Sequence, residues 1–243
     1  SPLAPTGRGC HKVTGEGFYC SSIQDFARNF GIAFQIRDDL INAKTSQNDF
    51  KEGIYTAPVI FANSVEEFQN GIEKIQILFN NYVDSALKCI ENLEESKYKA
   101  ALTNLLGLIK ISQNNLDEAE KLITEALSIK KDAYFYENLA RVYEYKKDYE
   151  TEIKVLEKAC KDVNCGFEIY FILALAYKKN IEYEKAEKAY LKALELNPKS
   201  EKTCFNLASL YLFLNNPQKA IEYFKKCLEI NPNDKEVLYF LSL

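Results

Sequence analysis

The stretches KAYLKALELNPKS (residues 188–200) and EYFKKCLEINPND (residues 222–234) align with a shift of 34 residues. The shift superposes small on small, aromatic on aromatic and proline on proline: Ala186 on Ala220, Tyr190 on Phe224 and Pro198 on Pro232. A fixed period of this length indicates stacked copies of one supersecondary unit. We therefore expect an array of helix pairs.

Earlier copies of the same unit precede these two stretches. An order of large, small and aromatic residues recurs at the same spacing: Leu207, Ala208 and Tyr211; Leu173, Ala174 and Tyr177; Leu139, Ala140 and Tyr143; Leu106 and Gly107. Small residues let two helices approach closely, and large residues fill the space beside them. Pro198 then ends a pair, because proline cannot continue a helix.

This pattern resembles the tetratricopeptide repeat, whose unit is a helix pair of this period. The resemblance covers about residues 100–234 in four units, and a fifth unit begins at Lys235 and is cut at the end of the chain. Glu152 stands where the second unit should have a small residue, and Lys110 stands where the first should have an aromatic one. We assign residues 100–243 to an α-solenoid of about four helix pairs.

The resemblance implies a concave groove that is lined by the first helix of each pair and binds a peptide. The matching positions in units two to four are Tyr134, Glu137, Arg141 and Glu144; Glu168, Phe171, Leu175 and Lys178; and Lys202, Phe205, Ser209 and Leu212. The family's carboxylate-clamp pattern of lysines and asparagines is absent here. We therefore expect a mixed or partly apolar ligand.

The residues before the array also predict helices. Apolar positions in residues 22–41 recur at helical spacing, and a polar loop follows up to Pro58. Residues 64–93 begin with the capping-box spacing of Ser64 and Glu67 and continue as a long amphipathic stripe. This part of the chain is expected to be helical as well.

Two motifs in this part stand in a recognisable order. Phe34-Gln35 precedes the paired carboxylates Asp38 and Asp39, and the stretch DFKEGIYTAPVI (residues 49–60) follows. Together they resemble the C-terminal part of the trans-isoprenyl diphosphate synthases, or polyprenyl synthetases, an all-helical family. We assign residues 22–99 to a fragment of such a helical bundle, which would join the array through one shared helix or a tight stack.

The synthase resemblance implies transfer of an allylic prenyl group to isopentenyl diphosphate. Magnesium, which prefers hard oxygen ligands, would neutralise the diphosphate leaving group. By resemblance Asp38 and Asp39 would hold magnesium, Phe34 and Gln35 would line the substrate cavity, and Lys44 would contact diphosphate. From the residues alone, two aspartates on a helix are usually a solvated face.

Several departures argue against activity of this chain alone. Asn42 replaces the last aspartate of the motif, and Ile54 replaces the lysine of the following loop. The family's first aspartate-rich motif is missing from the chain. A half-site of this kind binds diphosphate weakly at best, so we expect no prenyltransferase activity from these residues alone.

Composition indicates a soluble globular protein without a bilayer-spanning segment. The 243 residues are 47% hydrophobic and 27% charged, with a formal net charge of -4. There is no basic cluster, apolar run or leader, so nucleic-acid binding is not expected and the cytoplasm is the default. The seven cysteines are expected to be reduced thiols, and Cys160 and Cys165 lack the partners that zinc requires.

Residues 1–21 break with the composition of the rest, because residues 1–20 hold four of the nine glycines and the only histidine. They are either a flexible linker or foreign sequence, and we assign them neither structure nor function. The absence of methionine indicates that the chain does not begin at its own start codon, and both ends look cut.

Two functions from different classes follow from these patterns. The first is a fragment of a polyprenyl synthase-like protein of isoprenoid biosynthesis, which carries a repeat module that recruits a partner or supports a homodimer. The second is a non-catalytic scaffold or adaptor that binds a peptide in its concave groove, with the synthase remnant capping the repeats.

Overall fold

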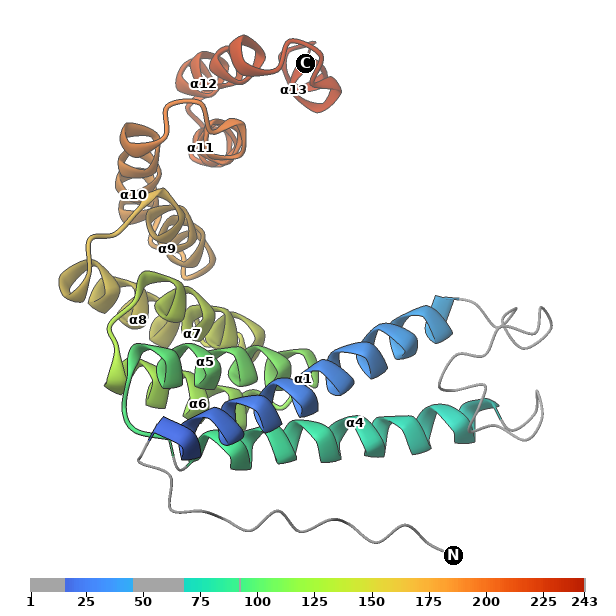
Figure 1. The fold of residues 1–243 in the computed structure, drawn as a ribbon. Helices are drawn as coiled ribbons and strands as arrows, with labels where there is room; N and C mark the ends of the chain where they lie inside the picture. Colours follow the sequence, from blue (N-terminus) through green and yellow to red (C-terminus); the bar gives the residue numbers. More distant parts are fainter. Residues whose placement is uncertain (1–15, 46–67, 92, 243) are drawn as a thin grey trace, which may run out of the picture. The chain divides into compact units, whose positions relative to one another are not determined.

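Every regular element in the described part of the chain is an α-helix, and the computed structural model describes residues 16–45, 68–91 and 93–242 (Figure 1). The chain divides into two compact units, Ser1–Leu106 and Gly107–Leu243. The division falls inside helix α5 (Lys97–Ser112). The expected all-α class is thus confirmed for the residues described.

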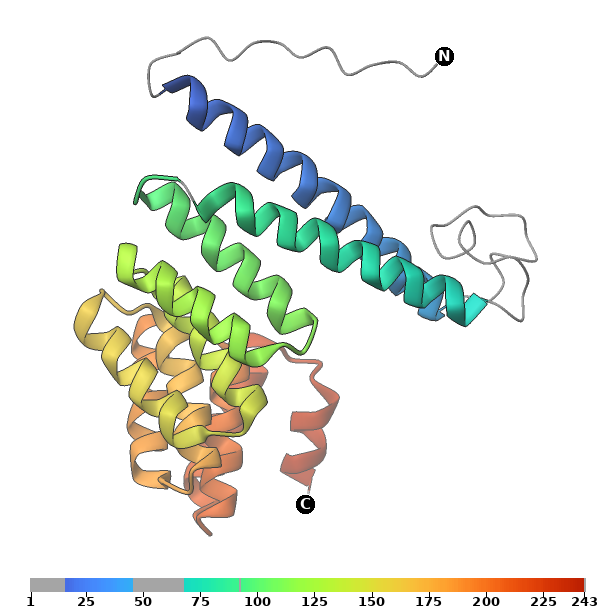
Figure 2. The same cartoon turned by 90° about the horizontal axis from the view of Figure 1, so that it is seen from below.

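Two long antiparallel helices, α1 (Glu16–Thr45) and α4 (Phe68–Glu91), pack against each other in the first unit (Figure 2). Apolar side chains at steps of three, four and seven are buried on the two helices: Phe26, Ala33, Ile36 and Leu40 on α1, and Ile75, Phe79, Val83, Ala86 and Ile90 on α4. The Asn29 amide donates to Cys89 Sγ at 3.7 Å across the pair. Burial of these two apolar stripes holds the pair together.

The extent of both helices differs from the sequence prediction. Helix α1 begins at Glu16, inside the segment to which the sequence analysis assigned no structure, and continues to Thr45 into the expected loop. Once a helix has formed, extending it by one residue costs little, which explains the extra turns. The predicted helix over residues 64–93 is observed as α4, and residues 64–67 lie outside the described residues.

The isoprenoid-synthase bundle expected for residues 22–99 is not shown. Its described part consists of α1, α4 and the beginning of α5, and the motif over residues 49–60 lies outside the described residues. Among the helices that the structure describes, none has the length and apolar character needed to cross a membrane.

The second unit is built from successive helix pairs, and it includes only residues 107–112 of α5. We call the first helix of a pair A and the second B. The pairs are α5 with α6 (Leu116–Ile129), α7 (Ala133–Lys146) with α8 (Tyr149–Asp162), α9 (Phe167–Lys179) with α10 (Tyr183–Leu196), and α11 (Glu201–Phe213) with α12 (Pro217–Ile230). Helix α13 (Lys235–Ser242) begins a fifth pair. The A helices α9, α11 and α13 follow the inner side of a curve, and α8, α10 and α12 follow its outer side (Figure 1).

The turn between helices A and B repeats in every pair. One residue takes a left-handed conformation: Asn114 at φ 59°, Lys147 at 59°, Ile181 at 64° and Asn215 at 56°. The next N–H donates to the carbonyl five residues earlier: Asn115 to Lys110, Asp148 to Tyr143, Glu182 to Tyr177 and Asn216 to Tyr211, at 2.8–3.0 Å. This arrangement satisfies carbonyls that the helix end leaves unpaired.

Side chains after these turns also begin the B helices. The Asn115, Asp148 and Asn216 side chains each accept a hydrogen bond from an N–H in the first turn of the following helix. Glu182 makes no such bond at the start of α10. Asparagine and aspartate are favoured at this position because their short side chains reach the unpaired N–H groups.

Small residues occupy the closest contacts of the array, as the repeat predicted. Ala140, Ala174, Ala186 and Ala208 are fully buried, and Tyr190 is also fully buried beside them. The alanines let the helices pack closely, and the large Tyr190 side chain fills the space beside that contact.

The two departures from the repeat are accommodated differently. Lys110 Nζ pairs with Glu118 Oε2 at 3.0 Å, so the buried lysine of the first pair has an opposite charge. Glu152 is 1% exposed, and its Oε2 has no hydrogen-bond partner among the described residues. Burying a carboxyl oxygen without a hydrogen-bond partner costs free energy, so Glu152 is less favourable for stability than the paired Lys110.

Candidate functional site

The twelve positions that the sequence assigned to the concave groove lie on α7, α9 and α11; we call them the groove row. None of these side chains is fully buried: Tyr134, Glu137, Arg141, Glu144, Glu168, Phe171, Leu175, Lys178, Lys202, Phe205, Ser209 and Leu212. Most of the residues between them are buried, among them Leu139, Leu173 and Leu207. Steps of three and four along a helix place the groove row on one face.

An aromatic cluster lies at the middle of the groove row. The Phe171 ring stacks on Phe167, with ring centroids 5.9 Å apart, and lies 6.1 Å from the Tyr190 ring. Lys202 Nζ, from the next pair, lies 4.6 Å from the Phe171 centroid and 5.2 Å from that of Phe167. A cation over aromatic faces is attracted by their electron density, so Lys202 is held between α9 and α11.

Charges of both signs surround this cluster. Burial raises the pKa of Glu137, and the nearby Glu168 carboxylate raises it further, while Arg141 lowers it. Partial burial lowers the pKa of Lys178. Both groups are therefore less solvated than surface charges, and a ligand group of opposite charge would relieve part of that cost.

Some members of the groove row already have partners within the protein. Glu144 Oε1 accepts from Lys179 Nζ at 2.5 Å, and Ser209 Oγ donates to the Phe205 carbonyl at 2.9 Å. These two side chains are thus less available to a ligand than Arg141 or Lys202, which are exposed.

Two aromatic residues of this region were not in the sequence prediction. Phe167 contacts Phe171, and Phe240 of α13 stacks on Phe224 with centroids 5.3 Å apart. Phe240 also meets Phe205 edge to face at 6.0 Å. The spacing of four between Phe167 and Phe171 was a usable signal, whereas the contact of Phe240 depends on how α13 stacks on the array.

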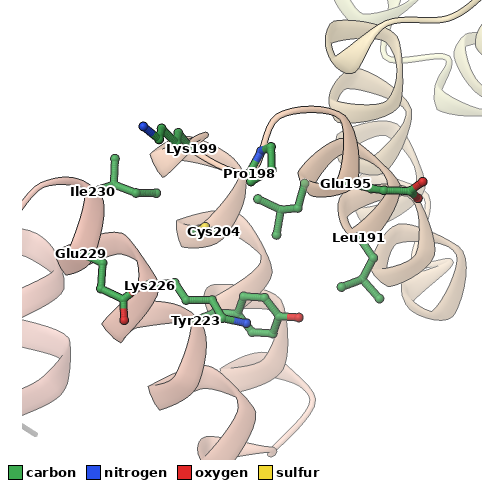
Figure 3. Close-up of a pocket in the computed structure, with 10 residues that line it drawn as sticks. Leu191, Glu195, Pro198, Lys199, Cys204, Tyr223, Lys226, Glu229 and Ile230 are labelled. Carbon is green, nitrogen blue, oxygen red and sulfur yellow. The ribbon is translucent and has the colours of Figure 1, made fainter.

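A pocket lies away from the groove row, between helices α10 and α12 and the linker that joins α10 to α11 (Figure 3). Its volume is about 560 Å³. Apolar residues and charged residues of both signs line it: Leu191, Leu194, Glu195, Pro198, Lys199, Cys204, Tyr223, Lys226, Glu229 and Ile230. The sequence analysis did not identify this pocket, because its walls come from two separate repeats.

Hydrogen bonds between tyrosines and glutamates join successive pairs. A tyrosine hydroxyl on an A helix donates to a carboxylate on the preceding B helix: Tyr143 to Glu120 at 2.7 Å, Tyr177 to Glu157 at 2.5 Å and Tyr211 to Glu187 at 2.5 Å. The repeat predicted these tyrosines as core residues. Their rings do fill space, and their hydroxyls fix the position of each pair on the one before it.

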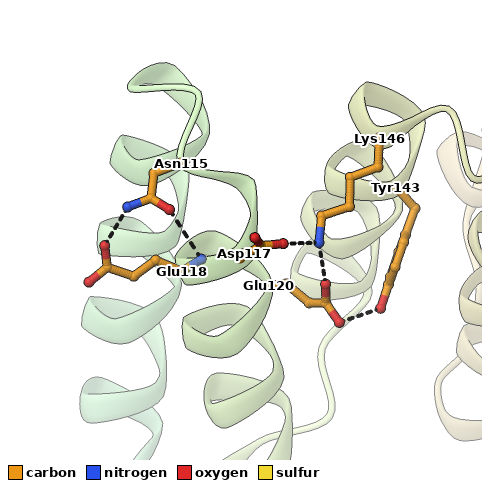
Figure 4. A network of polar contacts seen from close by, with 6 residues as sticks. All are labelled: Asn115, Asp117, Glu118, Glu120, Tyr143 and Lys146. Atoms are coloured by element: carbon orange, nitrogen blue, oxygen red, sulfur yellow. Dashed lines mark hydrogen bonds and ion pairs between the residues drawn. The ribbon is translucent and has the colours of Figure 1, made fainter.

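The junction between α6 and α7 has further polar contacts beside this bond (Figure 4). Lys146 Nζ donates to Asp117 at 2.6 Å and to Glu120 at 2.7 Å, and Glu120 also accepts from Tyr143. These bonds lower the pKa of Glu120, with Lys146 as the largest contribution. These three hydrogen bonds, two of them between opposite charges, thus hold the second helix pair on the first.

The residues assigned to a synthase site lie along α1. Phe34 is 46% exposed, and the Arg37 guanidinium lies 4.3 Å from its ring centroid. Arg37 pairs with Asp38 at 3.1 Å, and the Gln35 amide donates to Asp39 at 3.3 Å. The carboxylates therefore already interact with neighbours on their own helix.

The remaining parts of the predicted magnesium site are not observed. The Lys44 side chain and the loop motif lie outside the described residues. Within the part of the chain that the structure describes, no three His, Cys, Asp or Glu side chains gather as a metal site. The assignment of Asp38 and Asp39 to magnesium, and of Phe34, Gln35 and Lys44 to substrate, stays a prediction.

Comparison with protein-family models matches the chain to the tetratricopeptide repeat. The matched residues are 100–132, 133–161, 167–200 and 201–234. They begin after the expected synthase part and lend it no support. The comparison with curated protein sequences found no match.

Solved structures with a similar fold include MamA and YrrB. MamA from Desulfovibrio magneticus RS-1 is 19% identical, with a TM-score of 0.53, over 66% of this chain and 92% of that one. YrrB, described as a TPR protein with an unusual peptide-binding site, is 16% identical, with a TM-score of 0.54, over 82% of this chain and 100% of that one. At these identities the similarity shows the fold alone.

The repeat period, the helix pairs and the recurring turn agree with the family matches, which together cover more than half of the chain. The protein therefore belongs to the tetratricopeptide repeat family.

Proposed function

We propose that this protein is a non-catalytic interaction module that binds an extended peptide segment of a partner protein along the groove row. The observation that carries the proposal is that all twelve side chains of the groove row remain unburied, while their neighbours on the same helices form the core. Because this face of the A helices does not pack within the array, it is available to a ligand.

The chemistry of the groove row supports a ligand of mixed character. Phe171, Leu175 and Phe205 are partly exposed apolar side chains, and Glu137 and Lys178 are partly desolvated charges of opposite sign. We infer that the peptide places apolar side chains against the aromatic cluster and charged side chains against these two groups. YrrB, whose fold is similar and which is described as having a peptide-binding site, is in keeping with this use of the fold.

The proposal is tested with the full chain and a displayed library of random peptides. Enriched peptides are synthesised with a fluorescent label, and their affinity is measured by fluorescence anisotropy. We expect Lys202→Glu and Phe171→Ala to weaken binding strongly, since they change the charge and the ring at the centre of the groove row.

Lys158→Glu is the matched control. Lys158 is an exposed lysine on the B helix α8, and its reversal changes the net charge by the same amount as Lys202→Glu. Retained affinity in Lys158→Glu together with loss in Lys202→Glu supports the proposal. Equal affinity of all three variants and the parent protein would show that peptides bind elsewhere.

A further inference from the structure

The pocket between α10 and α12 has a thiol in its lining. Cys204, on the first turns of α11, contributes to the wall together with apolar residues of α10 and α12 (Figure 3). The Cys204 side chain is buried from bulk water at the depth of this pocket. A small molecule that enters the pocket therefore approaches the Cys204 side chain.

A second thiol lies beside Cys204, on the facing helix. Cys227 of α12 donates to the Glu201 carbonyl at 3.8 Å, which places its sulfur against the first turn of α11, the turn that also holds Cys204. The Asn231 amide donates to Glu201 Oε1 at 3.0 Å and holds the end of α12 at the same place. Both thiols are buried, and both are free.

The surroundings favour the reactive form of Cys204. The neighbouring Cys227 lowers the pKa of the Cys204 thiol, burial opposes this effect, and the positive charge of Lys226 adds to it. The neighbouring Cys204 and burial raise the pKa of Cys227. The thiolate is the nucleophilic form of cysteine. Cys204 lines the pocket and Cys227 does not, so Cys204 is the thiol that a reagent in the pocket meets first.

We propose that Cys204 is a site of oxidative modification by small hydroperoxides that enter through the pocket, and that Cys227 then resolves it to a disulfide. The Cys204 thiolate attacks one peroxide oxygen, so that the S–O bond forms and the O–O bond breaks. The leaving hydroxide, or the alkoxide of an organic hydroperoxide, takes a proton to become water or an alcohol. The Cys227 sulfur then attacks the sulfenic acid. The S–S bond forms, and the hydroxyl leaves as water with the proton of Cys227.

The two steps balance as one two-electron reaction. The two thiols lose two electrons and two protons in total, and the hydroperoxide is reduced. The product links α11 to α12 within the fourth helix pair. Because the link joins helices that already pack together, the array keeps its fold while the fourth pair becomes harder to separate.

Another pair of neighbouring thiols in the same chain serves as an internal control. Burial raises the pKa of Cys165 to about 12, and the neighbouring Cys160 adds to the rise. Neither residue lines the pocket of Figure 3. Hydroperoxide should therefore oxidise Cys204 before Cys165.

The experiment uses the folded full chain treated with limiting hydrogen peroxide. Remaining thiols are alkylated, and disulfide-linked peptides are identified by mass spectrometry after digestion. We expect a Cys204–Cys227 linkage that Cys204→Ser abolishes. In Cys227→Ser, a sulfenic acid on Cys204 should be trapped by dimedone. Preferential oxidation of Cys160 and Cys165, with Cys204 still alkylated, would overturn the proposal.

The route through the pocket is tested with two tryptophan variants on α10. Leu191 is 39% exposed and lines the pocket, whereas Leu196 is 46% exposed and does not. We expect Leu191→Trp to slow the peroxide-dependent loss of the Cys204 thiol several-fold relative to Leu196→Trp, with unchanged helicity in both. Equal rates would show that peroxide does not enter through the pocket, and would overturn that part of the proposal.

Discussion

Ile181 occupies a backbone conformation that β-branched residues rarely adopt. Its φ is 64°, and the equivalent residues of the other three turns are Asn114, Lys147 and Asn215. The Ile181 side chain is 71% exposed, so its burial does not offset the backbone strain. Asparagine tolerates this conformation better because its side chain is short and not branched at Cβ.

Replacing Ile181 with glycine should therefore stabilise the protein. We expect Ile181→Gly to raise the free energy of unfolding by about 1 kcal/mol, because glycine adopts a positive φ without strain. Urea unfolding followed by circular dichroism measures the change. Asn215→Gly, at the equivalent turn, should change stability much less, and a destabilised Ile181→Gly would contradict the explanation.

Glu152 is the buried carboxyl for which the repeat predicts a small residue. Burial raises its pKa to about 7 from an ordinary value of 4.5, the Glu144 carboxylate adds to the rise, and Lys179 opposes it. Glu152 therefore keeps its proton in the folded state at pH values where the unfolded chain has lost it.

The sign of the pH dependence follows from this difference. Between about pH 4.5 and pH 7 the folded state binds more protons than the unfolded state, so stability falls as pH rises. We expect Glu152→Gln to remove this pH dependence, which amounts to about 2–3 kcal/mol of the free energy of unfolding over this pH range. Urea unfolding at several pH values checks it, with the exposed Glu184→Gln as control. If stability depended on pH in the same way in Glu152→Gln and Glu184→Gln, Glu152 would not be the source of the pH dependence.

The first helix pair depends on a glycine at the contact between its two helices. A Cβ added at Gly107 would lie 2.6 Å from Ile123 Cγ1, and Ile123 is fully buried on α6. The packed isoleucine cannot move aside without disturbing its own neighbours. The small residue predicted at this position is therefore a requirement of the packing between α5 and α6.

Gly107→Ala should destabilise the protein although alanine favours helices. Overpacking costs about 1–3 kcal/mol, against a gain of about 1 kcal/mol in helix propensity. We expect a net loss of about 1 kcal/mol in urea unfolding. Gly166→Ala is the control, because its Cβ would meet only the Glu168 carboxylate oxygen at 3.3 Å. A stabilised Gly107→Ala would show that Ile123 repacks.

The helix pairs themselves were predictable because they depend on local spacing. Leu173, Ala174 and Tyr177 were placed in the core from a period of 34 residues, and all three are buried. The hydroxyl of Tyr177 was not placed, because its partner Glu157 lies on the preceding pair. Predicting contacts between helix pairs requires the angle at which the pairs stack, and the sequence pattern does not give that angle.

For the whole molecule, the array should act without the residues before it. Family matches begin at residue 100, and Ser96 Oγ accepts from the Lys99 N–H at the start of α5. We expect a chain that begins just before Ser96 to unfold cooperatively and to bind the selected peptide with unchanged affinity. Lost binding with intact folding would show that the N-terminal residues take part in recognition.

Asp38 and Asp39 lie on a single helix. Asp38 and Asp39 were assigned to magnesium because of their neighbours in the sequence, and α1 does place them on a helix as expected. Their observed partners are Arg37 and Gln35. A metal site requires ligands from several elements at once, and a motif on one helix does not establish that the others are present.

The sequence by itself determined the helical class, the repeat period and the face of each A helix that is left unburied, because these follow from side-chain spacing along single helices. Only the tertiary structure decided that Lys202 lies over Phe171, that Tyr177 reaches Glu157, and that Cys204 faces a pocket beside Cys227. These contacts join residues of different helices. Their geometry depends on how the helices stack, which is set by packing of the complete array and not by any one repeat.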